Sequence, residues 1–308
     1  MLRDDVVQGP IELPQPVVGS ERSLLGTAAA YVSLAKPRII VLLLVTTLPA
    51  MIMAESGMPS LWLVLLTLVG GTLAAGGANS INCYLDRDID GLMARTRDRA
   101  LPAGTVTPER ALLFGALLGV VAFIVLAVGV NLLSALLALM ALAFYVVVYT
   151  IWLKRTSPLN IVIGGAAGAV PPLVGWAAVT GDLSWTPWLL FGIIFLWTPP
   201  HFWALALRYR NDYAHAGVPM LPVVAGEAET RRQILLYAVA LVAITLVLVP
   251  VAGMGYLYLG SALALGAGFI GLAFWLWRSG APEARRALFI FSLAYLALLF
   301  LAMGLDQL

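Results

Sequence analysis

The sequence predicts an all-α, polytopic membrane protein in which nine transmembrane helices surround a central chamber. Its 308 residues are 61% hydrophobic and only 11% charged, a composition typical of a chain whose main solvent is lipid. Nine apolar stretches come close to the ~20 residues that a helix needs to span a bilayer. The basic residues fall at alternate connections between these stretches, as consecutive membrane crossings would require.

The expected helices follow one another with mostly short connections. The first begins after Lys36 and is closed by Glu55. Before it, residues 1–30 contain several prolines and charges but no apolar stretch, which predicts a flexible cytoplasmic N-terminal extension. Residues 31–308 are expected to form a single transmembrane domain. The predicted spans are 37–54, 61–82, 111–129, 132–152, 159–179, 187–207, 233–252, 256–277 and 287–305.

The basic residues also predict the orientation of the helices. Connections rich in Lys and Arg stay on the cytoplasmic side, and with nine helices all 18 basic residues fall on one side. The opposite connections contain only Glu55 and Asp182, and Asp306 lies near the carboxy terminus. We therefore expect the amino terminus inside and the carboxy terminus outside. The membrane is expected to be the bacterial cytoplasmic (inner) membrane. The net charge of +2 offers no electrostatic footprint for nucleic acid.

A polar motif follows the second apolar stretch. Residues 79–90 carry five acidic or amide side chains, and if the helix continues, Asn82, Asp86 and Asp90 lie four residues apart on one face. Hard divalent cations such as Mg2+ take oxygen ligands, usually one or two carboxylates together with water and substrate phosphates. The motif therefore predicts a Mg2+ site that receives a diphosphate. A solvated helix end is the alternative interpretation.

A second polar connection, residues 208–232, also follows an even-numbered helix and combines Asp212 with several arginines. It could face the first polar connection, residues 85–110. Arginine, lysine and Mg2+ stabilise the charge that develops on a phosphoryl group, so two such loops would suit a metal-bridged diphosphate. Positive-inside orientation alone also accounts for every one of the arginines.

Four segments carry a resemblance to a known family. The spacing of Asn82, Asp86 and Asp90 at a helix end resembles the first signature of the UbiA superfamily of intramembrane prenyltransferases. The second signature of that superfamily usually has two aspartates four residues apart. In this sequence the residue four positions after Asp212 is Ala216 and not an aspartate. The segments similar to the branch of the superfamily that farnesylates heme are 82–90 (NCYLDRDID), 160–172 (NIVIGGAAGAVPP), 197–203 (WTPPHFW) and 212–222 (DYAHAGVPMLP).

The resemblance implies a UbiA-like fold and a Mg2+-dependent reaction. Farnesyl diphosphate would transfer its farnesyl group to a vinyl group of heme B, with addition of water, to give heme O and diphosphate. Heme B is then a substrate and not a retained cofactor. Membrane lipid surrounds the protein, and a heme A synthase or a terminal oxidase assembly is an expected partner.

The residues expected in the site fall into three groups. Asn82, Asp86 and Asp90 are the candidate metal ligands and, with Asp212, the candidate catalytic residues. His201 lies near a helix end, where it could ligate heme iron, as imidazole commonly does, or hydrogen-bond to a neighbouring helix; Tyr213 and His215 are the other candidates for binding heme. The candidate diphosphate-binding residues are Lys36, Arg38, Arg95, Arg99, Lys154 and Arg208.

Two other functions fit part of this pattern. A related prenyltransferase would use the same diphosphate motif with an aromatic, quinone-precursor or chlorin acceptor, and only the segments around His201 and Asp212 favour heme. A membrane transporter would also have many helices and buried carboxylates, often in inverted repeats with broken helices. The clustering of the acidic residues at one membrane face favours diphosphate chemistry over alternating access.

Overall fold

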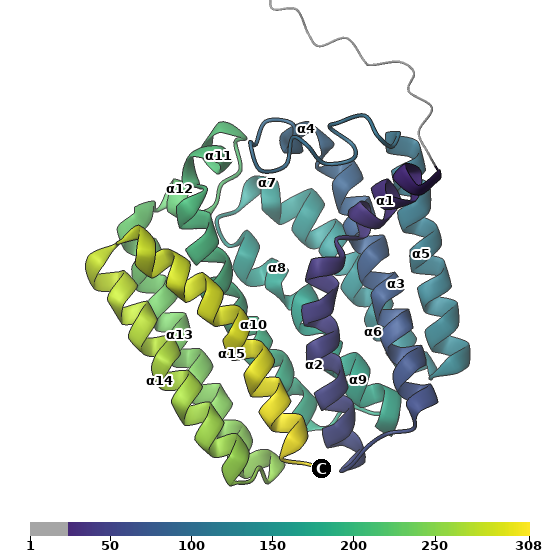
Figure 1. Cartoon of the computed structure of the whole chain (residues 1–308), viewed down its shortest axis with the longest axis vertical. Helices are drawn as coiled ribbons and strands as arrows, with labels where there is room; N and C mark the ends of the chain where they lie inside the picture. Colours follow the sequence, from purple (N-terminus) through teal and green to yellow (C-terminus); the bar gives the residue numbers. More distant parts are fainter. Residues whose placement is uncertain (1–23) are drawn as a thin grey trace, which may run out of the picture.

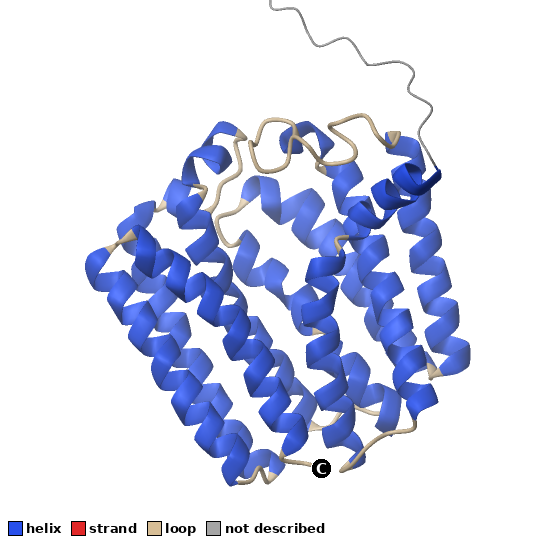
Figure 2. Cartoon of the chain, in the orientation of Figure 1, coloured by secondary structure: helices blue, strands red, loops and turns tan. Residues whose placement is uncertain are grey.

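The computed structural model describes residues 24–308, and this part of the chain consists of helices joined by loops, without any strand (Figure 2). Nine of its helices are long and apolar enough to cross a membrane, which confirms the predicted fold class. The elements are α1 (Leu24–Ala35), α2 (Pro37–Glu55), α3 (Leu61–Leu85), α4 (Arg87–Asp90), α5 (Pro108–Gly129), α6 (Leu132–Ala143), the π-helix η1 (Phe144–Leu153), α7 (Lys154–Thr156), α8 (Asn160–Ala169), α9 (Pro171–Thr180), α10 (Trp185–Arg208), α11 (Arg210–His215), α12 (Leu221–Val224), α13 (Gly226–Ala252), α14 (Tyr256–Ser279) and α15 (Pro282–Leu305).

The N-terminal extension expected over residues 1–30 lies mostly outside the described residues. Its last part differs from the prediction, because residues 24–30 belong to helix α1. This helix is apolar but has only 12 residues, too few to cross a bilayer.

Two of the nine spans are not continuous α-helices. The fourth span consists of α6, η1 and α7 without a break in the chain, so a π-helix forms its central part. The fifth span divides at Val170 into α8 and α9. Proline has no N–H to donate, so Pro171 is accommodated as the first residue of α9. The fifth span is therefore interrupted directly before Pro171 and Pro172. The sequence did not predict the π-helix of the fourth span.

The spans pack as a bundle in which the first and last helices are neighbours (Figure 1). α2 packs against α9 and α15, while α10 packs against α8, α13 and α15. The α3–α5 interface is very close, since a Cβ on Gly77 would lie 2.7 Å from the carbonyl oxygen of Gly115. Small residues permit such close approach of membrane helices.

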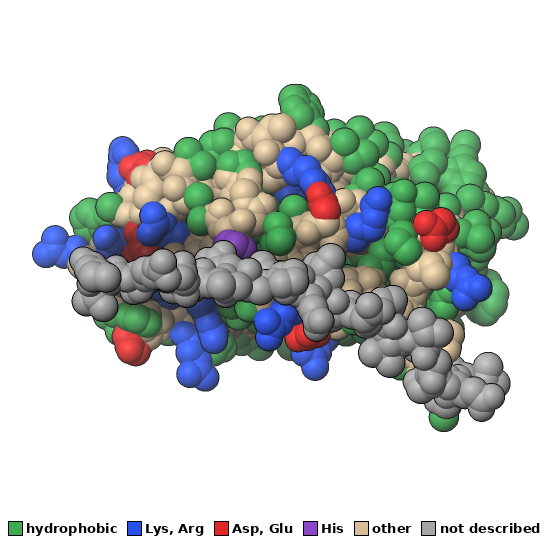
Figure 3. Space-filling model, turned by 90° about the horizontal axis from the view of Figure 1, so that it is seen from above, with side chains coloured by type: hydrophobic (Ala, Val, Ile, Leu, Met, Phe, Trp, Pro, Cys, Tyr) green, Lys and Arg blue, Asp and Glu red, His purple; other side chains and the backbone are tan. Residues whose placement is uncertain are grey.

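One end of the bundle is polar. It carries α4, α11, α12 and the ends of α3 and α10 (Figure 1), and every Lys and Arg of the described residues lies at or next to this end. Viewed from above this end, basic and acidic side chains are scattered over the face while hydrophobic side chains form much of the rim (Figure 3). The helices thus bring both polar connections to the same face.

Candidate active site

The polar motif spans the end of α3 and all of α4. α3 ends at Leu85 and Asp86 separates it from α4, so the helix does not continue without interruption. The four-residue spacing nevertheless survives, because the Asp86 amide donates to the Asn82 carbonyl over 2.9 Å and the Asp90 amide donates to the Asp86 carbonyl over 2.8 Å. The three side chains are 3%, 0% and 1% exposed, in chain order. They are therefore buried at the polar end of the bundle, which rules out a solvated helix end.

Asn82 is held by three partners from different parts of the chain. Its amide oxygen accepts a hydrogen bond from Lys36 Nζ (2.8 Å). Its Nδ2 donates to Asp86 Oδ2 (2.7 Å) and to Thr150 Oγ1 (3.1 Å). Burial lowers the pKa of the Lys36 amine, and the nearby charges of Arg99 and Lys154 lower it further. An anionic ligand would relieve this crowding of positive charge.

Asp86 is fully buried and has one oxygen to spare. Lys154 Nζ donates to its Oδ2, which also accepts from Asn82. Its Oδ1 has no hydrogen-bond partner among the described residues, although Arg155 Nη2 lies 3.9 Å away. A buried carboxylate oxygen without a partner is costly, so Oδ1 is suited to a further cationic ligand.

Asp90 is bound by an arginine of the loop that follows α4. Arg99 Nη1 donates to both carboxylate oxygens, at 2.9 and 2.8 Å. Thr96 fixes the same loop by donating to the Asp90 carbonyl over 2.7 Å. The loop therefore folds back over the end of the motif.

Asp88 has a different environment, as its position on another helical face predicts. It is 59% exposed and pairs with Arg155 through two hydrogen bonds of 2.7 Å. The hydrogen bonds from Arg155 lower the pKa of Asp88 to about 2. Asp88 therefore forms a surface ion pair with Arg155 beside the buried site.

The π-helix η1 and the adjoining α7 each carry one partner of the motif. Thr150 and Lys154 contact Asn82 and Asp86 respectively, and Thr150 Oγ1 also donates to the carbonyl of Tyr145, five residues earlier (2.9 Å). The wide turn of a π-helix often marks a functional site. Gly164 of α8 makes room for this turn, since a Cβ there would lie 2.3 Å from Cδ2 of Tyr149. Sequence reasoning named Lys154 but missed Thr150, whose only signal is a hydroxyl one turn before that lysine.

The two polar connections meet, as expected, through Arg95 of the first. Its guanidinium lies over the ring of Tyr209, 5.4 Å from the centroid, and donates from Nη2 to the hydroxyl of Tyr213 (3.3 Å). The guanidinium of Arg208 also lies over the ring of Tyr209, again 5.4 Å from its centroid. The second polar connection therefore contacts the first through the ring of Tyr209 and the hydroxyl of Tyr213.

The other predicted site residues do not join this cluster by direct contact. Arg38 and His215 are exposed and Asp212 is half-buried, and none of the three has a side-chain hydrogen bond or ion pair within residues 24–308. His201 belongs to α10 and is buried against α15, where its Nδ1 lies 2.7 Å from Ser292 Oγ. The hydrogen bond to a neighbouring helix that the sequence allowed for His201 is therefore present.

Comparison with known proteins now identifies the family. Residues 43–301 match the model of the UbiA prenyltransferase family. The chain belongs to the UbiA prenyltransferase family. It is therefore a prenyl-transferring enzyme of the membrane, and the transporter alternative is set aside.

Curated members of the UbiA family resemble this chain over nearly its full length. A protein of Gloeobacter violaceus named protoheme IX farnesyltransferase is 59% identical over 294 residues, which cover 94% of this chain and 96% of the relative. A protein of the same name from Synechocystis is 54% identical, with 93% of this chain and 91% of the relative covered.

Solved structures of UbiA-type proteins share the fold. A digeranylgeranylglyceryl phosphate synthase matches with a TM-score of 0.75 at 18% identity, covering 91% of this chain and 98% of that one. A UbiA homologue from Archaeoglobus fulgidus, described as bound to DMAPP and Mg2+, matches with a TM-score of 0.63 at 17% identity, covering 90% of this chain and 98% of that one.

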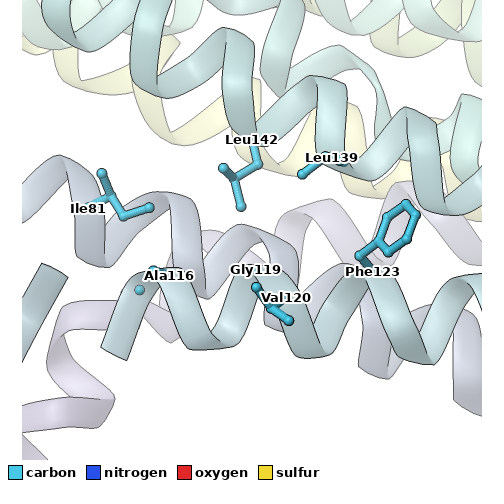
Figure 4. Close-up of a pocket in the computed structure, with 8 residues that line it drawn as sticks. Ile81, Ala116, Gly119, Val120, Phe123, Leu139 and Leu142 are labelled. Carbon is cyan, nitrogen blue, oxygen red and sulfur yellow. The ribbon is translucent and has the colours of Figure 1, made fainter. Parts of the chain in front are cut away.

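An apolar pocket lies apart from the UbiA polar motif, between α3, α5 and α6 (Figure 4). Ile81 is its only residue next to the motif, and it points to another face of α3 than Asn82 because successive helical residues are about 100° apart. The pocket offers no group for diphosphate chemistry. Its lining residues are Ile81, Gly115, Ala116, Gly119, Val120, Phe123, Leu139 and Leu142.

Proposed function

We propose that this enzyme transfers the farnesyl group of farnesyl diphosphate to a vinyl group of heme B, with addition of water, and so forms heme O and diphosphate. The observation that carries the proposal is the burial of two carboxylates, Asp86 and Asp90, among three cationic side chains at one end of the membrane bundle. Relatives at 54–59% identity are named protoheme IX farnesyltransferases, which supports heme B as the acceptor.

The motif has the donor set that Mg2+ prefers with a diphosphate. The described residues contain no group of three or more His, Cys, Asp or Glu side chains that could hold a metal ion by themselves. Mg2+ commonly needs only one or two carboxylates, since water and substrate phosphates complete its shell. Asp86 offers a buried oxygen without a partner, and Asp90 and Asn82 provide the neighbouring oxygens. When bound there, Mg2+ would neutralise charge on the leaving diphosphate.

The cationic side chains around the motif have a clear task in this reaction. Lys36 contacts Asn82, Arg99 contacts Asp90 and Lys154 contacts Asp86. All three would bind the phosphate oxygens. Their positive charge stabilises the electron pair that departs with diphosphate when the allylic C–O bond breaks. Arg95 of the first polar connection contacts the second through Tyr209 and Tyr213 and, with Arg38 and Arg208, would bind diphosphate or a heme propionate.

The acceptor supplies the electrons for the new bond. The vinyl group attacks the allylic carbon, and the cation left beside the porphyrin ring takes up water and loses a proton, which leaves a hydroxyl group. Exclusion of water until the carbon–carbon bond has formed prevents loss of the farnesyl cation. Tyr213, His201 and His215 are the residues that we assign to the acceptor side, His201 on α10 against α15 and the other two in the second polar connection. Asp212, in the same connection, is retained as a candidate catalytic residue.

The enzyme would act at the cytoplasmic face of a bacterial inner membrane. The described Lys and Arg residues all lie at or next to one end of the bundle, and such an asymmetry orients that end toward the cytoplasm. The carboxy terminus lies at the opposite end (Figure 1), which supports a position outside. Water-soluble diphosphate would then leave into the cytoplasm.

A reconstitution experiment tests the proposed function. The purified protein in lipid vesicles receives heme B, farnesyl diphosphate and Mg2+, and the extracted porphyrins are weighed by mass spectrometry, with a chelator control. A hydroxyethylfarnesyl heme that disappears with chelator is the expected product. Prenylation of an aromatic or quinone-like acceptor without any heme product would overturn the assignment of heme while leaving the diphosphate site in place.

A further inference from the structure

His201 lies in an enclosed setting that fixes its ring. The imidazole stacks on Trp197 (centroids 4.3 Å apart, planes at 16°) and on Phe289 (4.8 Å, 22°). Its Nδ1 lies 2.7 Å from Ser292 Oγ of α15. The indole of Trp197 donates to the carbonyl of the same Ser292 over 2.8 Å. α10 and α15 together therefore hold both the plane and the rotation of the ring.

The proton positions in this arrangement follow from the donors available. A serine hydroxyl has one proton, and Ser292 Oγ lies 2.7 Å from the Phe289 carbonyl, which can only accept. The hydroxyl proton is thus used for that bond, so Ser292 Oγ can only accept a hydrogen bond from Nδ1–H of His201. In a neutral imidazole only one nitrogen carries hydrogen, which leaves Nε2 unprotonated.

The surroundings favour this neutral form. The ring contacts aromatic side chains and a hydroxyl, and no carboxylate pairs with it among the described residues. An imidazolium without a counter-charge would be costly in such a place. Nε2 thus carries a lone pair directed away from Ser292.

That lone pair is open to a ligand. Nε2 has no partner within residues 24–308, and it is not among the fully enclosed polar atoms that lack a partner. The residue keeps 7% of its surface exposed, and the adjacent Phe202, which meets the ring edge-on at 5.2 Å, is 39% exposed. The imidazole is consequently not completely enclosed by the described residues.

We propose that Ser292 is a positioning residue that holds His201 in its Nδ1–H tautomer, so that Nε2 ligates the iron of the heme substrate. Metal-bound histidines usually donate the other ring N–H to a fixed acceptor, which sets the tautomer and the ring orientation. This assignment rests on the proposed function, because it takes the prenyl acceptor to be an iron porphyrin. It gives the acceptor a fixed anchor on α10.

Heme B binding to the full-length protein tests the assignment without prenyl transfer. The absorption and resonance Raman spectra of the reduced complex are recorded for the wild type, His201→Gly and Ser292→Ala. The control is Tyr295→Phe, which removes another buried hydroxyl of α15 that contacts Thr245 and not His201. The wild type and the control should show an iron–histidine stretching band, which His201→Gly loses and added imidazole restores.

Ser292→Ala separates positioning from packing. It should keep the iron–histidine band but shift its frequency, because Nδ1–H loses its acceptor, and heme affinity should fall by about tenfold, as it does for supporting residues of other metal ligands. An unchanged band and affinity in this variant would overturn the role of Ser292. A His201→Gly spectrum identical to that of the wild type would overturn ligation, even if heme O is still formed. Failure of the wild type to bind heme or to form a heme product would instead overturn the proposed function together with this assignment.

Discussion

Lys36 donates a hydrogen bond from Nζ to Oδ1 of Asn82 (2.8 Å) while its own backbone is left-handed, with φ at 55°. Lysine seldom adopts this conformation, which costs an L-residue roughly 1–2 kcal/mol. The conformation lies at the junction of α1 and α2. The chain therefore accepts local strain where it directs an amine to the motif.

Replacement of Lys36 separates the two effects. Lys36→Gly and Lys36→Ala should both lower turnover by about 100-fold, a loss typical of removing one donor to a developing anion. Lys36→Gly should, however, be more stable than Lys36→Ala by about 1 kcal/mol, because glycine adopts positive φ without strain. Thermal unfolding in detergent and product formation measure the two quantities. Equal stability of the two variants would mean that residue 36 is not held in the left-handed conformation.

Replacement of the three aspartates of the motif should have very different effects on turnover. Asp86→Asn and Asp90→Asn should lower turnover by at least about 100-fold with protein abundance retained, because each removes a buried charge from the metal and diphosphate site. Asp88→Asn is the matched control. Its exposed pair with Arg155 contributes at most about 1 kcal/mol, so turnover should stay near that of the wild type. Normal turnover of the Asp86 or Asp90 variant would remove that residue from the site.

Thr150 should prove to be a support for Asn82. Thr150→Val keeps the shape of the side chain but removes the acceptor of the Asn82 Nδ2 hydrogen bond, whose net worth is about 1 kcal/mol. Turnover should fall several-fold, and Thr150→Ser should recover most of it because the hydroxyl returns. The initial rate of heme product formation distinguishes these variants. Equal rates in the valine and serine variants would show that the methyl group, and not the hydroxyl, matters.

Two glycines of α8 allow a test of the close packing against η1. Gly164→Ala would place a Cβ 2.3 Å from the ring of Tyr149, whereas Gly168→Ala meets nothing within 4 Å. Overpacking typically costs 1–3 kcal/mol, so the first variant should unfold at a lower temperature and lose activity as η1 shifts. The second should match the wild type in both respects. A Gly164→Ala variant as stable as the wild type would indicate that η1 and α8 can move apart without a loss of stability.

The parts of the site that were predictable from sequence depend on local spacing. Asn82, Asp86 and Asp90 share a face because consecutive helical turns place them there, and the short interruption at Asp86 preserves that relation. Lys36, Arg99 and Lys154 were expected near the motif from their charge and their side of the membrane, and the structure brings all three to it.

The remaining features depend on tertiary packing. Thr150 reaches Asn82 only because residues 144–153 form a π-helix, and the space that Gly164 leaves for Tyr149 has no signature in either segment alone. Positive-inside orientation likewise brings Arg38 and Arg208 to the correct face without deciding whether they contact the motif. Nothing in the local sequence of His201 indicates Ser292, which lies 91 residues later.

The π-helix makes the fourth span sensitive to length rather than to composition. Each residue of a helix turns the chain about its axis, and the turn of a π-helix is wider than that of an α-helix. Deleting or inserting a single residue between α6 and α7 would therefore change the direction of Lys154 relative to Asp86 even if every apolar side chain were kept. Substitutions on the lipid-facing side of this span should be tolerated, while insertions and deletions should not. Chimaeras between relatives should therefore exchange residues 132–156 as one block, with their number unchanged.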